Sequence, residues 1–390
     1  MELNAILKEL SDRIGSDLHL KVGRPPLFRI SGDLNPTDYS EVTHEELSTL
    51  LSGIMPPKLK SKFERDLEAD FSYEIPGFAR FRVNAFIQRG DIGVVFRLIP
   101  IAVPTIEELG LPGVLYDLAE QPDGVVLVTG PTGCGKSTTL AAMIEHINDT
   151  RPVHIMTIED PIEFLYADKM ATINQRELGL DTLDLLTALR AVLRQDPDVI
   201  LMGEMRDVET MAFAITAAET GHLVFSTLHT NDAKQTIDRV LDTFPPEKGK
   251  QIRGQLALTL RGVISQRLVK RADRQGLIAA VEVMINSPNV RQIIEEGATR
   301  DLEKAIESSG YYKMQTFNQA YAELVKRGII TAEEALSNTS NPDDLKLALR
   351  GVQRGSAAEE LDLDFEKKSS DQAKPPGPQE KKKIPRGFEF

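Results

Sequence analysis

Residues 130–137 read GPTGCGKS and fit the pattern G-x-x-x-x-G-K-[ST]. Immediately before them, residues 125–129 (VVLVT) form an apolar, β-branched run that predicts a buried strand. After them, residues 137–148 carry their apolar side chains on one face of a predicted helix. A strand, a glycine-rich loop and a helix in this order form a cradle in which backbone amides bind phosphate groups.

The loop supplies the groups that a nucleoside triphosphate needs. The pattern predicts that Lys136 reaches the β- and γ-phosphates of ATP, and that the Ser137 hydroxyl binds Mg²⁺. The N-terminus of the following helix adds partial positive charge at the same place. The residues expected to hold ATP are Gly130, Pro131, Thr132, Gly133, Cys134, Gly135, Lys136, Ser137 and Thr138.

Composition narrows the class of protein. The 390 residues include 59 acidic and 46 basic side chains. The net charge of −13 argues against a protein that binds nucleic-acid backbones in general. Cys134 is the only cysteine, which excludes an intramolecular disulfide and a cysteine zinc cluster. A helix N-terminus lowers a thiol pKa, so Cys134 is either reactive or a small loop side chain. No stretch approaches the ~20 apolar residues of a membrane span, and we expect a cytoplasmic protein.

The pattern along the chain predicts two domains, a linker and a tail. Residues 1–99 alternate like strands, with a hairpin turn at 89–91, and are expected to form a small α/β domain. Prolines mark residues 100–112 as a linker. From 113 to 354 strands alternate with helices, which is typical of an α/β fold with a parallel sheet. Residues 355–390 combine a PPGP run with interspersed charges and are expected to be a disordered, charged tail.

Three further apolar runs of the second domain end close to Glu159, Glu204 and His229. Ligands of open parallel sheets bind beyond the carboxyl ends of the strands, so we expect these side chains to surround one nucleotide with Lys136. Glu204 is the predicted base that polarises the attacking water, and Glu159 is expected to orient water or complete the metal shell through solvent. An N-cap or a loop salt bridge is the structural alternative for Glu159. We expect His229 to hydrogen-bond the γ-phosphate, while His222 suits helix capping as well as catalysis.

Arginines of the first domain add a further prediction. Phosphoryl-transfer sites often take an arginine from a neighbouring subunit, which is worth roughly 10³–10⁵ in rate. Arg80, Arg82 and Arg97 lie on adjacent predicted strands, and alternation places Arg80 and Arg82 on one face. These side chains either serve another subunit or belong to a solvated sheet face.

Four stretches follow one another along the second domain. They are GPTGCGKSTT from residue 130, TIEDPIEF from 157, LRQDPDVILMGEMRD from 193 and AAETGHLVFSTLHTNDA from 217. They resemble the Walker A, Asp box, Walker B and His box motifs of the secretion ATPase superfamily. The resemblance is closest to the type IV pilus retraction ATPase family of PilT and PilU. GSDLHLKVGRPP and RFRVNAFIQRG extend it into the first domain.

This resemblance implies a PAS-like first domain, a RecA-like P-loop ATPase domain and a homohexameric ring that shares each nucleotide between subunits. It implies that Glu204 is the catalytic Walker B glutamate, and that Glu159 belongs to the Asp box. His222 and His229 would belong to the His box, while Arg82 and Arg97 would reach the γ-phosphate. The work would be ATP-driven pilin disassembly, passed to an inner-membrane platform protein at the inner face of the cytoplasmic membrane.

Two differences from the family keep alternatives open. Cys134 stands where the loop usually has serine, and residues 287–294 read SPNVRQII where PilT carries an AIRNL motif. A PilU-like accessory retraction ATPase and a type II secretion-related ATPase are therefore alternatives, and a second retraction ATPase joins the expected partners. Intact Lys136 and Glu204 oppose a non-catalytic subunit, and the absence of an aromatic-basic pattern opposes a nucleic-acid motor.

Overall fold

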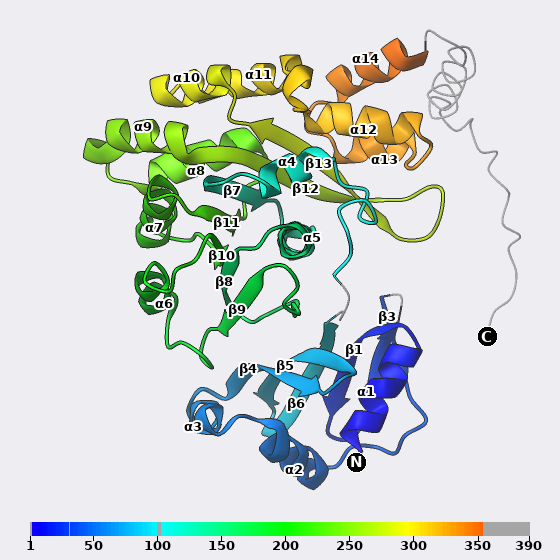
Figure 1. Cartoon of the computed structure of the whole chain (residues 1–390). Helices are drawn as coiled ribbons and strands as arrows, with labels where there is room; N and C mark the ends of the chain where they lie inside the picture. Colours follow the sequence, from blue (N-terminus) through cyan, green and yellow to red (C-terminus); the bar gives the residue numbers. More distant parts are fainter. Residues whose placement is uncertain (1, 31, 100–102, 354–390) are drawn as a thin grey trace, which may run out of the picture.

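The computed structural model describes residues 2–30, 32–99 and 103–353. These residues form an N-terminal domain and the predicted ATPase domain, each with its own β-sheet (Figure 1). The predicted tail, residues 355–390, and the first part of the predicted linker, residues 100–102, lie outside the described residues.

The N-terminal domain is built on a six-stranded antiparallel sheet with the order β3-β2-β1-β6-β5-β4. In β5, Phe81, Val83 and Ala85 are buried while the residues between them are partly exposed, so the sheet has one apolar and one polar face. Three helices contribute to the apolar core. The elements are α1 (Leu3–Asp12), β1 (Gly15–Lys21), β2 (Leu27–Ile30), β3 (Asp33–Pro36), α2 (His44–Ile54), α3 (Pro57–Asp66), β4 (Glu68–Ile75), β5 (Ala79–Gln88) and β6 (Asp91–Ile99).

The hairpin predicted around residues 89–91 is confirmed. Gln88 pairs with Asp91 across the end of β5 and β6, and the two residues between them adopt positive φ angles. Arg89 has a φ of 51° and Gly90 a φ of 87°, which matches the twist that two-residue hairpins require. This tight turn fixes the register of the two strands that carry the arginines predicted to be functional.

The ATPase domain contains a seven-stranded sheet with the order β13-β12-β7-β11-β10-β8-β9. Every neighbouring pair is parallel except β12 and β13, so the predicted parallel sheet is confirmed. The four strands predicted from apolar runs are β7, β8, β10 and β11, and they lie together in the middle of the sheet. The strands are β7 (Gly124–Thr129), β8 (His154–Glu159), β9 (Thr172–Glu177), β10 (Val199–Glu204), β11 (Leu223–Leu228), β12 (Leu260–Lys270) and β13 (Leu277–Ile285).

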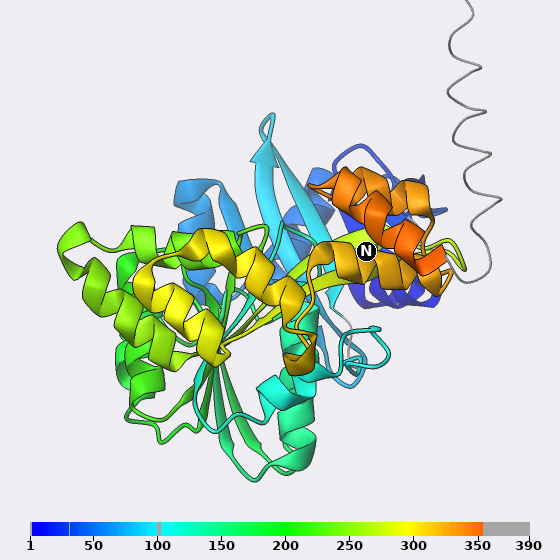
Figure 2. The ribbon, with the colours of Figure 1, turned by 90° about the horizontal axis from the view of Figure 1, so that it is seen from above.

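Helices cover both faces of this sheet, because its central strands are apolar on both sides. The helices α4 and α5 pack on one face, and the helices from α6 to α11 contribute to the core on the other. The helices α12, α13 and α14 pack on the ends of β12 and β13, away from the N-terminal domain (Figures 1 and 2). The helices are α4 (Val114–Ala119), α5 (Lys136–Thr150), α6 (Leu185–Val192), α7 (Val208–Glu219), α8 (Ala233–Thr243), α9 (Gly249–Thr259), α10 (Pro288–Glu296), α11 (Leu302–Ser308), α12 (Phe317–Lys326), α13 (Ala332–Asn338) and α14 (Pro342–Gln353).

The described part of the proline-marked segment is anchored on the ATPase domain. Ile106 and Leu111 are buried in the same apolar cluster as α5. This part of the predicted linker therefore packs on the domain that follows it. Among the described residues, no helix combines the length and the apolar character needed to cross a bilayer.

A buried carboxyl group supports the start of α8. Glu282 on β13 is 6% exposed, and its Oε1 accepts a hydrogen bond of 2.8 Å from the Ala233 amide. Burial raises the pKa of Glu282 to about 7, and the nearby carboxylates of Asp232 and Glu303 raise it further than Arg267 lowers it. The folded protein therefore holds this proton more tightly than the unfolded chain does.

This difference predicts a stability that falls with rising pH. The contribution of Glu282 is fully present below its ordinary pKa of 4.5 and is lost as the pH rises through about 7. Its upper limit is about 3 kcal/mol, taken from about 1.4 kcal/mol per pKa unit. Between about pH 5 and about pH 8, the urea midpoint of the wild type should therefore shift downward relative to that of Glu282→Gln, which lacks the titrating group. An equal pH dependence in the variant would contradict the assignment.

Candidate nucleotide site

The predicted phosphate loop joins the end of β7 to the start of α5. Gly130, Gly133 and Gly135 have φ angles of 140°, 78° and 91°, a region that side chains other than glycine rarely adopt. A Cβ on Gly130 would lie 2.4 Å from the carbonyl oxygen of Gln266, so the loop also passes against the backbone of β12. Conformation therefore requires all three glycines, and close approach to β12 is a second requirement at Gly130.

The loop and helix offer positive charge without a fixed anionic partner. No side chain caps α5, whose N-cap residue is Gly135, so its first amides point into the loop. Lys136 is 9% exposed, and its Nζ donates hydrogen bonds to the carbonyl oxygens of Gly130 at 2.8 Å and Pro131 at 3.1 Å. Within the described part of the chain, the Lys136 ammonium group bonds only carbonyl oxygens and the N-terminus of α5 has no side-chain cap, an arrangement that fits the phosphates of a nucleotide.

Cys134 fills space inside the loop. Its side chain is buried, and the loss of solvent raises the pKa of the thiol above its usual value despite the nearby Lys136. The neutral thiol is therefore favoured, and the structure supports the interpretation of a small loop side chain over a reactive one.

The structure brings two predicted site residues into contact at the end of β10. The Oε2 atom of Glu204 accepts a hydrogen bond of 2.8 Å from Arg206 Nε and lies 3.4 Å from His229 Nε2. Glu204 is paired with Thr227 on β11, two residues before His229, which explains why the two side chains meet. Glu204 and His229 thus lie together at the carboxyl edge of the sheet, as expected.

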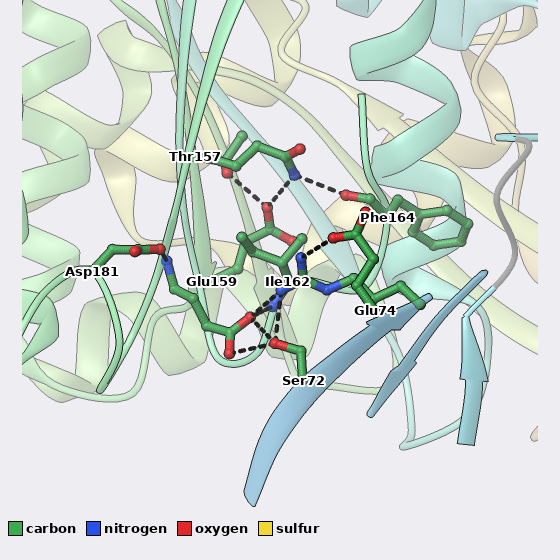
Figure 3. A network of polar contacts seen from close by, with 10 residues as sticks. Ser72, Glu74, Thr157, Glu159, Ile162, Phe164 and Asp181 are labelled. Atoms are coloured by element: carbon green, nitrogen blue, oxygen red, sulfur yellow. Dashed lines mark hydrogen bonds and ion pairs between the residues drawn. The ribbon is translucent and has the colours of Figure 1, made fainter. Parts of the chain in front are cut away.

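Glu159 ends β8 at the same edge and is held by neutral donors. Its Oε1 accepts hydrogen bonds from Thr157 Oγ1 at 2.7 Å and from Gln175 Nε2 at 3.2 Å (Figure 3). Burial raises the pKa of Glu159 by more than the hydrogen bonds from Thr157 and Gln175 lower it. Gln175 also bonds the backbone of Phe164 and Tyr166, so it fixes both the carboxylate and the loop that follows it.

Other predicted residues lie elsewhere in the chain. Arg82 is 3.5 Å from Asp70, and Arg97 donates a hydrogen bond of 2.8 Å to Asp17, all within the N-terminal domain. Within the described residues, no hydrogen bond or ion pair joins either arginine to the phosphate loop. His222 precedes β11 at the opposite edge of the sheet, where its Nδ1 contacts the Ala217 carbonyl oxygen at 2.9 Å. Its contacts are those of a helix cap at the end of α7.

Three polar residues near Glu159 and Glu204, at the carboxyl edge of the sheet, were not predicted from the sequence. Arg206 bonds Glu204, Gln175 bonds Glu159, and Glu177 at the end of β9 accepts bonds from both domains. The one available signal was alternation in residues 172–177, which places Gln175 and Glu177 on the same strand face as the apolar Ile173.

Comparison with known proteins agrees with this geometry. The sequence profile of type II/IV secretion system proteins matches residues 80–337. The chain is 47% identical over 344 residues to the type IV pilus retraction ATPase PilT of Pseudomonas aeruginosa, covering 88% of this chain and 100% of that protein. It is 39% identical over 350 residues to the type IV pilus ATPase PilU of the same organism, covering 90% and 92%.

A solved structure shares the fold as well. The crystal structure of the pilus retraction motor PilT with bound ADP has a TM-score of 0.83 and 42% sequence identity, covering 89% of this chain and 99% of that one. An intact phosphate loop at the carboxyl edge of a parallel sheet accompanies this likeness over most of the chain. The chain is thus a nucleotide-binding ATPase that belongs to the PilT/PilU family of secretion ATPases.

Proposed function

We propose that the chain is an ATP-hydrolysing motor that powers type IV pilus retraction as a homohexameric ring. The observation that supports it best is the shared contact of Arg206 and His229 with Glu204, a carboxylate at the same carboxyl edge of the sheet as the phosphate loop. The relatives named as a pilus retraction ATPase and a pilus ATPase supply the biological context. The motor would act at the cytoplasmic face of the inner membrane on a platform protein of the pilus.

The site residues divide the chemistry of hydrolysis between them. Lys136 binds the phosphates, and the Ser137 hydroxyl would hold a Mg²⁺ that neutralises charge on the phosphate oxygens. Glu204 orients the water whose oxygen bonds the γ-phosphorus as the bond to the β–γ bridging oxygen breaks. His229 hydrogen-bonds the γ-phosphate, and Glu159 orients solvent around the metal. ADP and phosphate are the products.

The site would be completed by a neighbouring subunit. Arg82 and Arg97 are adjacent on β5 and β6. Arg82 pairs with Asp70 and Arg97 with Asp17, rather than with the phosphate loop. Their side chains are 40% and 68% exposed, which leaves both accessible to a second copy of the chain. An arginine supplied in this way stabilises charge on the transferred phosphoryl group.

The accessory, PilU-like role is the second candidate. The stretch from Ser287 to Ile294, which departs from the PilT motif, forms the N-cap and most of α10. Identity is nevertheless higher to PilT than to PilU, at 47% against 39%. The type II secretion alternative is less well supported, because the chain covers only 53% of the related protein HxcR.

Two substitutions test the chemistry. Lys136→Ala should abolish ATP hydrolysis and weaken ADP binding, because it removes the cation that contacts phosphate. Glu204→Gln should keep nucleotide affinity and lower kcat by roughly 10²–10⁴-fold, the usual contribution of a general base. Turnover assays and titration with a fluorescent ADP analogue measure both effects. Gly113→Ala is the control, since a Cβ there meets no atom within 4 Å. Wild-type turnover in either site variant would refute these assignments.

A cellular experiment tests the biological role. Deleting the gene should leave cells with pili that extend but fail to retract, as seen by live microscopy of labelled pili. Wild-type protein should restore retraction and Glu204→Gln should not, because retraction requires hydrolysis. Normal retraction after deletion would rule out the main motor role, and retraction that fails only under load would favour the accessory role.

Mixing two inactive proteins tests the shared site. Arg82→Ala and Lys136→Ala should each be inactive alone, yet mixed rings should regain part of the ATPase activity. Some interfaces would then combine an intact Arg82 with an intact Lys136. Mass spectrometry of the assembled rings verifies the mixing. Absence of rescue at every mixing ratio, in rings confirmed to be mixed, would argue against a site shared through Arg82.

A further inference from the structure

A buried carboxylate joins the two domains outside the predicted site. Glu177 is the last residue of β9, the edge strand of the ATPase domain, and it is 2% exposed. Its carboxylate accepts hydrogen bonds from the N-terminal domain and from the loop that follows β8. A carboxylate buried to this degree needs donors on several sides, because desolvation disfavours its charge.

The donors come from both domains. From the N-terminal domain, Arg80 Nη2 donates a hydrogen bond of 2.7 Å to Oε2, and Ser72 Oγ lies 2.8 Å from each carboxylate oxygen. From the ATPase domain, the Ile162 amide donates a hydrogen bond of 3.2 Å to the same Oε2. Ile162 belongs to the segment that directly follows Glu159. One carboxylate therefore binds the N-terminal domain and the loop of a predicted site residue at once.

The same strand also positions Glu159. Glu159 and Glu177 are register partners on β8 and β9, and the Leu178 amide bonds the Glu159 carbonyl oxygen at 2.9 Å. Gln175, two residues before Glu177, bonds the Glu159 side chain and the Phe164 carbonyl oxygen. A shift of the end of β9 would therefore move both the loop and the Glu159 carboxylate.

Because Glu177 is buried and Arg80 is largely buried, their ion pair cannot lose one partner without a large cost in free energy. The side chains of Arg80 and Glu177 are 14% and 2% exposed, and removing one partner would leave an uncompensated buried charge. Arg80 Nε is itself buried and has no hydrogen-bond partner among the described residues. Around this pair, Leu180 packs against the N-terminal core and its carbonyl oxygen lies 3.4 Å from Lys58 Nζ. Separation of the domains here would break several contacts together.

We propose that Arg80 and Glu177 form a domain latch that positions the loop after Glu159 for hydrolysis. Here the latch means Arg80, Ser72, Glu177 and the Ile162 amide. While the N-terminal domain rests on β9, the latch holds the loop and Glu159 in place; when the domain moves away, the loop loses this support. The inference rests on the proposed function of Glu159 in ATP hydrolysis. Arg80 and Glu177 are positioning residues, since no hydrogen bond or ion pair among the described residues joins either of them to the phosphate loop.

Three variants and one control test the latch. Arg80→Ala removes the ion pair, Glu177→Gln removes its negative charge, and Ser72→Ala removes a neutral donor and leaves both charges in place. Glu74→Gln is the control: Glu74 lies 4.0 Å from Arg80 Nη1 on a side chain that is 52% exposed, where solvent screens the interaction. It makes the same chemical change next to the same arginine without touching Glu177.

The expected result is a loss of kcat at unchanged nucleotide affinity. Arg80→Ala and Glu177→Gln should lower kcat roughly tenfold to a hundredfold, the effect of displacing a catalytic group by about 1 Å. The double variant should be no worse than the more impaired single one, because both act through one contact. Ser72→Ala should have a smaller effect in the same direction, and Glu74→Gln should match the wild type. Wild-type kcat in Arg80→Ala and Glu177→Gln, or in Ser72→Ala if neither of these folds, overturns the latch.

Hydrogen exchange separates this inference from the proposed function. In the folded wild type bound to ADP, the segment containing Ile162 should be protected, and Arg80→Ala should raise its exchange while the phosphate loop stays protected. A purely structural role would change the thermal midpoint without this local difference. Unchanged exchange at Ile162 in Arg80→Ala overturns the latch even if ATP is hydrolysed. Failure of the wild type to hydrolyse ATP would overturn the proposed function, while the exchange measurement would still test the contact.

Discussion

The parallel register of the central strands is the constraint on which the site depends. Thr129 at the end of β7 is level with Leu228 of β11 and Ser265 of β12. Along the same edge, Glu204 of β10 pairs with Thr227 of β11, and Glu159 of β8 pairs with Glu177 of β9. Parallel pairing brings the carboxyl ends of strands far apart in sequence to one edge. Because the central strands are buried on both faces, a slip along the sheet would expose apolar side chains. The packing of the central strands in the core therefore fixes the positions of the site residues at their ends.

The charges gathered at this edge are held by neighbouring groups. Lys136 contacts loop carbonyl oxygens, whose partial negative charges a phosphate can replace, and Glu159 is held by neutral donors. In a site of low polarity, such fixed dipoles act strongly on a charged ligand because little solvent screens them. Their arrangement before a nucleotide binds reduces the reorganisation that hydrolysis would otherwise require.

Prediction from the sequence succeeded where the signal was local. The phosphate loop, the four central strands and the hairpin at residues 89–91 all follow from runs of adjacent residues. It failed for Glu177, because the donors of that carboxylate lie up to 105 residues away and β9 is a polar edge strand. Alternation also placed Arg80 and Arg82 on one face, but only the docking of the two domains distinguishes them.

Glu204 and Glu177 lie on the two strands that flank the strand of Glu159, and they differ in how easily their partners can be replaced. Arg206 and His229, which contact Glu204, are 75% and 47% exposed, so water can replace either at low cost. Glu177 and its partner Arg80 are buried, and their separation exposes an unpaired charge. A change of partner at Glu204 therefore costs less free energy than a loss of the contact at Glu177, which joins the two domains. A protein that converts hydrolysis into movement needs this difference, because a domain that moved with every side-chain fluctuation could not transmit force.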